Sequence, residues 1–497
     1  MVAAKFGADL EKNLQLLKER LGEGKDIIWR NFTIGASGAR GALLYVDGLT
    51  DKTTLQEQVL KPLVILSTDY PAGREFRGTF GLEKVMDHLL SAGGVKREEE
   101  VNKAVIALLA GDTLVLLQNC SHCLIVSTRG WSARSITEPA TEALIRGPRD
   151  GFVETLMVNI ALVRRRIRDD RLVVDLRQLG VRSQTDVAVM YIKDLAPPEL
   201  VEEVNRRLDK INLDALIEAG YVEQLIEDNL WSPFPQLQHT ERPDKVVGGL
   251  LEGRIAILVD NSPFALLLPA TLPVLYQSPE DYYERWQVAS FARFLRFIAS
   301  FFSVLTPAAY IAITSYHPGM LPTKLAMAIA SSRGGVPFPA FVEAALMEIS
   351  FELLREAGAR LPRAIGQTIS IVGGLVIGNA AVQAGIASPI MIIIVAITAI
   401  ASFTIPHYNV AAGLRLMRFP LMVAAALLGM YGVILGFILL NIHFVRLKSF
   451  GVVYIQPAVP FNLRDWKDVI FRMPWQAMKL RPSTFNARDE VRMGDKP

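Results

Sequence analysis

The sequence predicts an α/β region of two small α/β subdomains, followed by an all-α polytopic membrane domain. Three observations lead to this prediction. Apolar residues make up 51% of the 497 residues while 21% are charged, which suits a soluble region joined to a membrane bundle. Strand-like and helix-like stretches alternate in the front half. Several runs after residue 291 lack charged residues and are long enough to cross a bilayer.

We expect the first α/β subdomain in residues 1–137. Residues 41–48 form an apolar stretch closed by an Asp-Gly turn signal, and residues 114–117 and 124–127 have the pattern of further strands. Apolar residues at helical spacing in 84–90 and 98–109 predict helices beside this sheet.

The second subdomain with its connector is expected in residues 138–240. Residues 155–167 predict a helix, 172–176 and 185–192 predict strands, and Pro197-Pro198 opens another helix. A membrane-proximal segment, 241–290, follows. No internal repeat at a fixed period is apparent.

The membrane domain is expected in residues 291–450, with four to five spans. Runs 297–323, 366–414 and 419–445 carry no charged side chain, and a turn at Ser388-Pro389 splits the long middle run into two spans. A fifth candidate, 321–354, is interrupted by Pro337 and Pro339, so we expect a discontinuous segment.

Basic residues beside these runs predict the orientation, because cytoplasmic flanks are rich in Lys and Arg. With four full spans, this rule places the front half and a tail, 451–497, in the cytoplasm. If segment 321–354 also crosses, one basic cluster must violate the rule, and the sequence leaves both cases open. The flanking residues are Arg293, Arg296, Arg355, Arg360, Arg363, Arg415, Arg418, Arg446 and Lys448.

Composition and motifs argue against several classes of function. The 53 basic and 50 acidic residues nearly balance, so nucleic acid is not an expected partner. Cys120 and Cys123 have zinc or redox spacing, but the chain has no second cysteine pair to complete a zinc site. We predict no catalytic residues, no metal site, no cofactor and no enzyme activity.

Several segments, in the same order along the chain, resemble the A-subunit family of spore germinant receptors, the GerA type. They include residues 127–139 (STRGWSARSITEP), 146–154 (RGPRDGFVE), 240–244 (TERPD), 253–257 (GRIAI), 280–283 (EDYY), 336–339 (VPFP), 366–378 (GQTISIVGGLVIG) and 380–385 (AAVQAG). Gly319 and Gly334 stand where family members often carry acidic residues, so ion preference is expected to differ.

The resemblance implies an A subunit in the spore inner membrane that works with a permease-like B subunit and a lipoprotein C subunit. The resemblance also implies that membrane lipid surrounds it and that its copies assemble into a nutrient-gated channel for monovalent cations. Two alternatives stay open: an accessory paralogue that amplifies ion release without its own nutrient partner, and a stand-alone secondary transporter.

Polar residues within the apolar runs are the candidates for a pore or ion path, since burying them in lipid is costly. Uncharged members either line a wet lumen or hydrogen-bond between neighbouring helices. Carboxylates either mark an ion path or lie at the membrane interface, paired with nearby arginines. The candidates are Gln367, Thr368, Asn379, Gln383, Glu343 and Glu348.

Two further groups are candidates for packing and docking. Gly373, Gly374 and Gly378 permit close helix packing, or alternatively a gating hinge. Arg164, Arg165 and Arg166 predict a basic face that docks on anionic lipid or an acidic neighbour, or is simply a solvated helix face.

Overall fold

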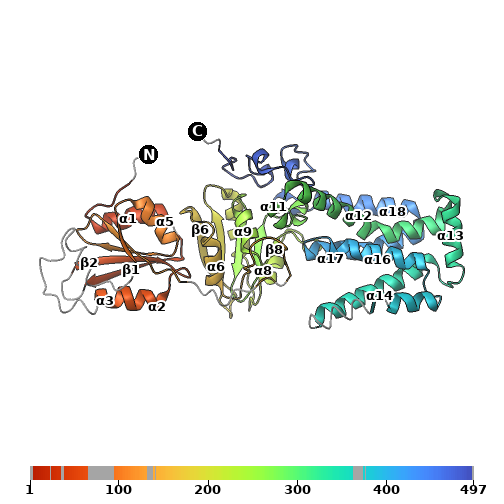
Figure 1. Ribbon diagram of the computed structural model, residues 1–497, viewed down its shortest axis with the longest axis horizontal. Coiled ribbons are helices and arrows are strands. Elements are labelled where there is room, and N and C mark those ends of the chain that lie inside the picture. The colour runs from red at the N-terminus through yellow and green to blue at the C-terminus, as the bar shows by residue number, and fades with distance from the viewer. Residues whose placement is uncertain are drawn as a thin grey trace. The chain divides into compact units, whose positions relative to one another are not determined.

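The computed structural model describes residues 4–22, 24–34, 39–64, 94–130, 138–139, 141–361, 373–374 and 376–494. The chain forms two compact units (Figure 1). The α/β unit comprises Met1–Glu227, Leu237–Pro269 and Lys479–Pro497, and the helical unit comprises Asp228–Gln236 and Ala270–Met478. The predicted fold class is confirmed, because two antiparallel sheets precede a helical part. The helix predicted at 84–90 lies outside the described residues.

The first sheet of the α/β unit has the strand order β1-β2-β4-β5-β3, with every neighbouring pair antiparallel. Its strands are β1 (Ile27–Ile34), β2 (Ala39–Val46), β3 (Val95–Glu98), β4 (Thr113–Leu117) and β5 (Cys123–Val126). Helices α1 (Leu10–Leu21) and α5 (Val101–Leu109) cover one face (Figure 1). Helix α2 (Lys52–Thr54), the π-helix η2 (Leu55–Leu60) and α3 (Lys61–Val64) follow β2, and η2 and α3 pack on the other face.

The second sheet has the order β6-β7-β9-β10-β8 and is also antiparallel. Its strands are β6 (Leu172–Leu179), β7 (Thr185–Ile192), β8 (Gln238–Thr240), β9 (Ile255–Val259) and β10 (Ala265–Leu268). Helices α6 (Leu156–Arg164) and α9 (Pro243–Leu250) pack on one face, and α7 (Pro198–Leu208) and α8 (Ala219–Ile226) lie between β7 and β8 in sequence. The expected boundary at residue 240 therefore moves to 269, because the buried strands β9 and β10 complete this sheet.

The two sheets are copies of one topology, a repeat that was not apparent in the sequence. Asn13 in α1 exchanges two hydrogen bonds with the backbone of Gly7, and Asn159 in α6 does the same with Val153. Asn119 and Asn261 take the left-handed conformation between the last two strands of each copy, with φ of 62° and 65°. Both asparagine pairs occupy equivalent positions, so the α/β unit consists of two modules that share one topology.

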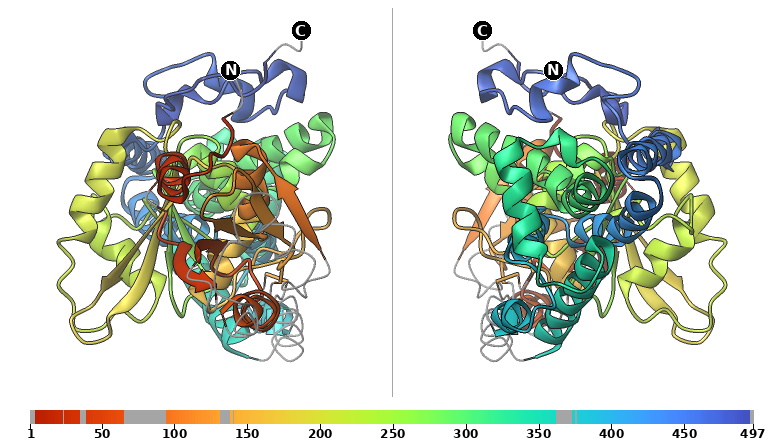
Figure 2. Two further views of the ribbon diagram at one scale, coloured as in Figure 1. Left: turned by 90° about the vertical axis from the view of Figure 1, so that its left-hand side faces the viewer. Right: turned by 90° about the vertical axis from the view of Figure 1, so that its right-hand side faces the viewer.

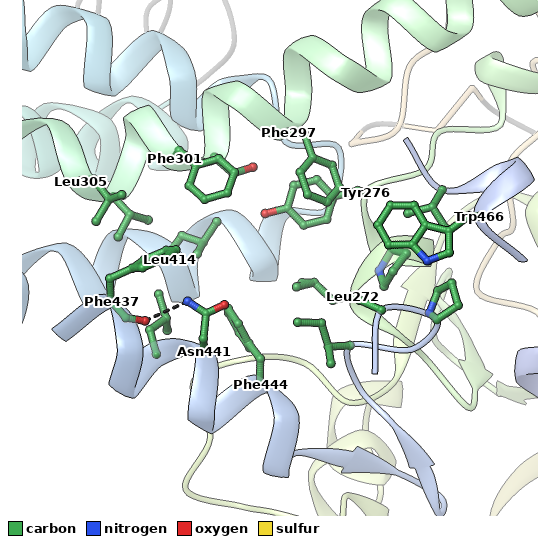
Figure 3. Close-up of a pocket in the computed structure, with 18 residues that line it drawn as sticks. Leu272, Tyr276, Phe297, Phe301, Leu305, Leu414, Phe437, Asn441, Phe444 and Trp466 are labelled. Carbon is green, nitrogen blue, oxygen red and sulfur yellow. Dashed lines mark hydrogen bonds between the residues drawn. The ribbon is translucent and has the colours of Figure 1, made fainter. Parts of the chain in front are cut away.

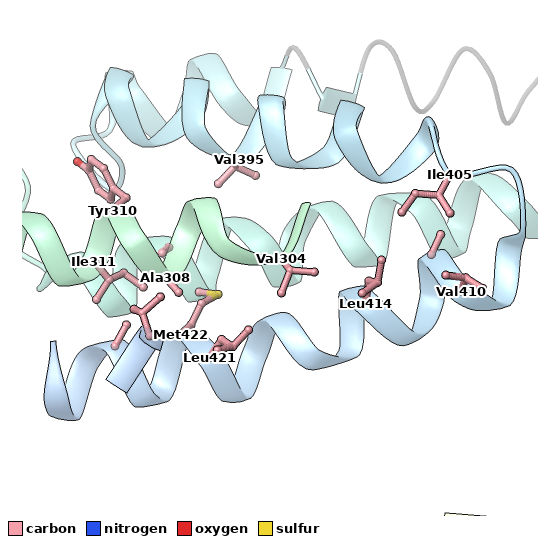
Figure 4. Close-up of a cluster of buried hydrophobic side chains, with 14 of the residues drawn as sticks. Val304, Ala308, Tyr310, Ile311, Val395, Ile405, Val410, Leu414, Leu421 and Met422 are labelled. Atoms are coloured by element: carbon pink, nitrogen blue, oxygen red, sulfur yellow. The ribbon is translucent and has the colours of Figure 1, made fainter. Parts of the chain in front are cut away.

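The helical unit is built around one long helix, α12 (Trp286–Tyr316), and Figure 2 shows the helices of this unit nearly end-on in its right-hand view. Among the described residues, α12 contacts the short α11 (Glu280–Tyr283) before it and four longer helices. Those are α14 (Ala340–Arg360), α16 (Pro389–Phe403), α17 (Tyr408–Leu428) and α18 (Met430–Arg446). Val304, Ala308 and Ile311 of α12 pack between α16 and α17 (Figure 4). Shorter helices are α10 (Leu272–Leu275), α11 (Glu280–Tyr283) and α13 (Thr323–Arg333), and residues 376–383 are also helical.

The helix boundaries differ from the predicted spans. The run 419–445 is not one helix, because the chain reverses at Gly429, whose φ of 61° suits glycine. A Cβ at Gly432 would clash with the carbonyl oxygen of Ala424, so α17 and α18 form a close hairpin. Among the described residues, α12 and α17 are long and apolar enough to cross a membrane, while α16 and α18 are apolar but shorter.

Segment 321–354 is interrupted, since α13 ends at Arg333 and α14 begins only at Ala340. The expected tail, 451–497, is divided between the units. Residues 451–478 belong to the helical unit and Lys479–Pro497 to the α/β unit, where Arg492 pairs with Glu252 at 2.8 Å.

Candidate functional site

Helix α14 carries a row of carboxylates into the core of the helical unit. Glu343 is 0% exposed and Glu348 is 1% exposed, and Glu352 is half-buried further along the helix. The row extends over about 14 Å at 1.5 Å per residue. Ionisable groups inside an apolar bundle are rare and need a partner, so the partners of each carboxylate define its possible role.

Glu343 is held at the N-terminus of α16. Its Oε1 atom accepts hydrogen bonds from the backbone N and the Oγ of Ser388, both at 2.6 Å, and Ser388 is the N-cap of α16. Its Oε2 atom accepts from Nε of Arg333 at 3.3 Å. A carboxylate at this position complements the helix dipole, so Glu343 fastens α14 to α16 and α13.

Glu348 is paired with a buried arginine from another helix. Arg418 of α17 donates from Nη1 to Glu348, and its own side chain is 1% exposed. Nε of Arg418 donates to the carbonyl oxygen of Ser303 at 2.8 Å. That carbonyl lacks its helical partner because Pro307, four residues on in α12, has no N–H. One guanidinium thus links three helices.

Glu352 closes the row with two arginines. Arg355 donates to it at 2.6 Å, and Nε of Arg415 lies 3.6 Å away. Arg355 also donates to Oγ of Ser402 at 3.3 Å and lies over the ring of Phe403. The carboxylates of α14 are therefore matched by arginines along the whole row.

Some buried polar atoms in this region have no hydrogen-bond partner among the described residues. They are Oε1 of Glu348, Nη2 of Arg418 and Nε of Arg355. Buried polar groups are normally satisfied by protein, ordered water or an ion. The carboxylates of α14 and their arginine partners thus form a line of polar groups in an otherwise apolar helical bundle.

The uncharged candidates lie elsewhere. Asn379 and Gln383 are exposed, one helical turn apart, in the helical residues 376–383. The structure does not bring them together with Glu343 and Glu348 in one site. Gln367 and Thr368 lie outside the described residues.

The candidate glycines lie where helices approach closely. A Cβ at Gly373 would lie 2.7 Å from Cδ2 of Leu354 in α14, and one at Gly378 would lie 3.6 Å from Cγ2 of Ile392 in α16. Gly374 is less confined, since its Cβ would meet Phe351 at 3.8 Å. Space for a larger side chain is therefore least at Gly373.

The expected basic face is only partly exposed. Arg164 is 1% exposed, because its guanidinium forms two hydrogen bonds with Asp26, at 2.7 and 2.9 Å. Burial removes Arg164 from any docking surface, and it joins the two modules instead. Arg165 and Arg166 line a pocket of about 790 Å³, together with Arg149, Arg168, Glu138, Pro148 and Asp150.

Within that basic pocket the arginines differ in their partners. Arg166 donates to Asp150 at 2.5 Å. Arg149 and Arg168 have no ion pair with any described residue. Two unneutralised guanidinium groups at one pocket favour an anionic partner.

The cysteines are structural in this fold. Cys120 and Cys123 are both buried, and burial raises the pKa of the Cys120 thiol to about 11 and that of Cys123 further. A high pKa leaves little thiolate for redox or metal chemistry. Within the described ranges, no group of His, Cys, Asp or Glu that could hold a metal ion is found.

Sequence reasoning missed Arg418 as a partner of Glu348 and treated it as a flanking charge. Arg293, another residue expected to flank a span, is 2% exposed and pairs with Asp281 at 2.8 Å and with Asp468 at 2.7 Å. One signal was available: Pro307 within an apolar helix frees the carbonyl of residue 303, which then needs a donor.

Comparisons with known proteins give a consistent picture. A family model described as Bacillus/Clostridium GerA spore germination protein matches residues 15–484. Spore germination protein KA of Bacillus subtilis (strain 168) is 45% identical over 486 residues, which cover 98% of this chain and 88% of that protein. Spore germination protein GerLA of Bacillus cereus is 43% identical over 487 residues, 97% of this chain and 98% of that protein.

Two other proteins also match this chain. An uncharacterized membrane protein of Bacillus subtilis (strain 168), YfkQ, is 44% identical over 475 residues, 96% of this chain and 90% of that protein. The crystal structure of the N-terminal domain of the A subunit of the Bacillus megaterium spore germinant receptor GerK3 aligns with a TM-score of 0.44 and 33% identity. It covers 55% of this chain and 99% of that chain.

Proposed function

Because the chain belongs to the Bacillus/Clostridium GerA family of spore germination proteins, we propose that it is the A subunit of a nutrient-germinant receptor. Copies of its helical unit assemble in the spore inner membrane into a nutrient-gated path for monovalent cations. The α/β unit lies in the cytoplasm. A permease-like B subunit supplies the nutrient site, and a lipoprotein C subunit completes the receptor.

The observation that carries the ion path is the exposure of Asn379 and Gln383. Both amides have no described hydrogen-bond partner and lie on one face of a helix within an apolar, charge-free stretch. Amides facing hydrocarbon would lose the hydrogen bonds that water provides. A face of this kind is stable in a membrane when it meets water or another protein chain, and a lumen between copies provides both.

The α/β unit offers complementary charges for such an assembly. Arg149 and Arg168 at the basic pocket carry unpaired positive charge, and Glu199 and Glu202 of α7 are exposed carboxylates without a cationic partner among the described residues. In this proposal the basic pocket of one copy receives the α7 face of the next. Head-to-tail contacts of this type form a ring when the rotation from one copy to the next closes.

An accessory paralogue without its own nutrient partner is the second candidate. One relative of comparable similarity, at 44% identity, carries no germination name. Similarity alone therefore does not separate a receptor subunit from an accessory protein.

Reconstitution tests the proposal. The purified chain is placed in potassium-loaded vesicles with and without its B and C partners, and potassium efflux is recorded while nutrients are added. Efflux that requires both the partners and a nutrient supports the receptor subunit. Efflux from this chain alone, independent of nutrient, supports the accessory paralogue, and no efflux from correctly inserted protein in either arm contradicts a conducting role.

A further inference from the structure

The helical unit exposes an apolar surface that begins before the predicted membrane span. The charge-free run starts at residue 297, but the preceding turns of α12 already carry exposed apolar side chains. Phe291 is 62% exposed, Phe294 is 42% and Leu295 is 46%. Phe471, in the segment that follows α18, is 57% exposed, and we call these four residues the apolar shelf. Contiguous exposed apolar surface marks a site that contacts a protein or a membrane.

The segment that carries Phe471 is fixed on α12. The rings of Phe294 and Phe471 lie 6.3 Å apart at an angle of 17°. The backbone N of Arg472 donates to Oγ of Ser290 at 3.0 Å. Trp466 of the same segment lines an apolar pocket that α12 and α18 also line (Figure 3). The shelf is therefore one surface, built from two segments that are far apart in the sequence.

The arginines in these turns of α12 point into the unit, so they leave the outer face apolar. Arg293 is 2% exposed and donates to Asp281 at 2.8 Å and to Asp468 at 2.7 Å. Arg296 donates to the same carboxylate of Asp281, also at 2.8 Å. The charges that interrupt the apolar run in the sequence are thus neutralised inside the protein and do not separate the shelf from the span.

Helix geometry makes the shelf continuous with the span. Phe291, Ile298 and Phe302 follow at helical spacing on one face of α12, and Phe302 is 49% exposed. The 31 residues of α12 extend over about 46 Å, whereas the hydrocarbon core is about 30 Å thick. Phe291 lies about 9 Å from Phe297 along the axis, which reaches from the core into the headgroup layer. Lipid that surrounds the span therefore meets the shelf as well.

The exposed charges near the shelf are all basic. Within the described residues 280–296 and 446–478, every acidic side chain is buried or half-buried. The exposed charged residues of these two ranges are Arg285, Arg446, Lys448 and Lys467. The cytoplasmic leaflet carries anionic lipids that attract basic residues close to its surface. This charge distribution favours a lipid surface as the partner of the shelf.

We propose that the apolar shelf binds lipid at the cytoplasmic membrane interface, with its side chains among the parts of the acyl chains closest to the headgroups. Surfaces that combine Phe and Leu with neighbouring basic residues bind this layer. The inference rests on the membrane location in the proposed function. It makes the segment after α18, expected from the sequence to be a cytoplasmic tail, a peripheral membrane element.

Depth-dependent fluorescence quenching tests the proposal. Phe291→Cys and Phe471→Cys are made separately in the full-length protein and labelled with nitrobenzoxadiazole. The natural Cys120 and Cys123 are buried, and the unsubstituted protein gives the background labelling. The nanodiscs contain phospholipids brominated either near the headgroup or near the chain end. The first lipid should quench at least about twofold more strongly, because interfacial side chains enter only about 5–10 Å into this boundary.

Two apolar positions with exposure similar to that of Phe471 provide matched references. Leu439, 57% exposed in the middle of α18, should show the reverse preference for the two lipids. Val181, 62% exposed in the α/β unit, should be quenched by neither. A Leu439 label outside lipid would contradict the membrane location itself. Neither measurement depends on potassium efflux, so the test is independent of the proposed ion path.

Two results would overturn the proposal while leaving the membrane location intact. In both, lipid quenches the label at Leu439. Shelf labels that aqueous iodide quenches as strongly as the Val181 label would place this surface in water. Shelf labels shielded from both iodide and brominated lipid would identify a protein, either a second copy or another subunit, as the partner. If one shelf variant does not fold, the other gives the same test.

Discussion

The Nε atom of Arg418 lies 2.8 Å from the carbonyl oxygen of Ser303, the carbonyl that Pro307 leaves without a helical donor. The same guanidinium neutralises Glu348. A proline within α12 and a buried charge in α17 are therefore parts of one arrangement. The predictions that follow start from this contact.

Replacing Arg418 with Met should destabilise the helical unit by about 3–5 kcal/mol, because it leaves the Glu348 carboxylate buried without its counter-charge. Thermal unfolding of the purified protein in nanodiscs measures the loss. The double variant Arg418→Met with Glu348→Leu should recover most of it. The control is Arg360→Met. It removes an exposed ion pair between Arg360 and Glu356, both on α14, and should have almost no effect on stability.

Adding Pro307→Ala to Arg418→Met should recover part of the stability, because the new N–H at residue 307 donates to the carbonyl of Ser303. Pro307→Ala in the wild-type background should give less benefit, since Arg418 already satisfies that carbonyl. Equal gains in both backgrounds would show that Arg418 and Pro307 act independently. A double-mutant cycle of unfolding free energies separates the two cases.

Replacing Asn379 or Gln383 with Leu should slow potassium release from nutrient-exposed spores several-fold, because an apolar side chain in a lumen hinders hydrated ions. Immunoblots of spore membranes establish that protein levels are unchanged. Ile400→Trp, at a position 66% exposed on α16, is the control for a bulky change and should leave release normal. Normal release in the Asn379 and Gln383 variants would remove these residues from the ion path.

Equivalent substitutions in the two modules should have equivalent local effects. Asn13→Ala and Asn159→Ala each remove a side chain that satisfies one backbone N–H and one C=O, at a cost of about 1–3 kcal/mol. Hydrogen exchange should accelerate at the amide of Gly7 in the first variant and of Val153 in the second. An effect confined to one module would contradict the structural equivalence of the copies.

Charge exchange tests the contact between copies. Reversing Arg149 and Arg168 to Glu should lower the yield of cross-linked oligomers, and reversing Glu199 and Glu202 to Lys should do the same. Combining the four changes should restore the yield, because opposite charges again face each other. Loss of binding to anionic vesicles after Arg149 and Arg168 reversal, with cross-linking unaffected, would assign the basic pocket to lipid headgroups instead.

Local sequence patterns are sufficient to predict many strands of the α/β unit. The predicted strands near 41–48, 114–117, 172–176 and 185–192 match β2, β4, β6 and β7, because alternating or continuous apolar residues and turn signals are properties of short segments. The two glutamates of α14 were also found from sequence, since a charge within an apolar helix stands out without any knowledge of its partner.

Local sequence patterns do not predict ion pairs between residues that are far apart along the chain. Arg418 lies 70 residues from Glu348, and Arg164 lies 138 residues from Asp26. The local sequence around each arginine is typical of a membrane-flanking segment or an exposed helix face. Whether the arginine is buried depends on which helix or module packs beside it. The repeat is not visible in the sequence for a similar reason. The two modules have the same residue at equivalent positions such as Asn13 and Asn159, but most of their other side chains differ.

The sequence by itself determined the order of an α/β region and an apolar helical region, and the family to which the chain belongs. These properties depend on composition and on short motifs that keep their meaning without a fold. The tertiary structure alone decided where the chain reverses between α17 and α18, how each buried charge is neutralised, and that two modules share one topology. Those features arise from contacts between distant segments, and close packing allows few alternatives once the segments meet.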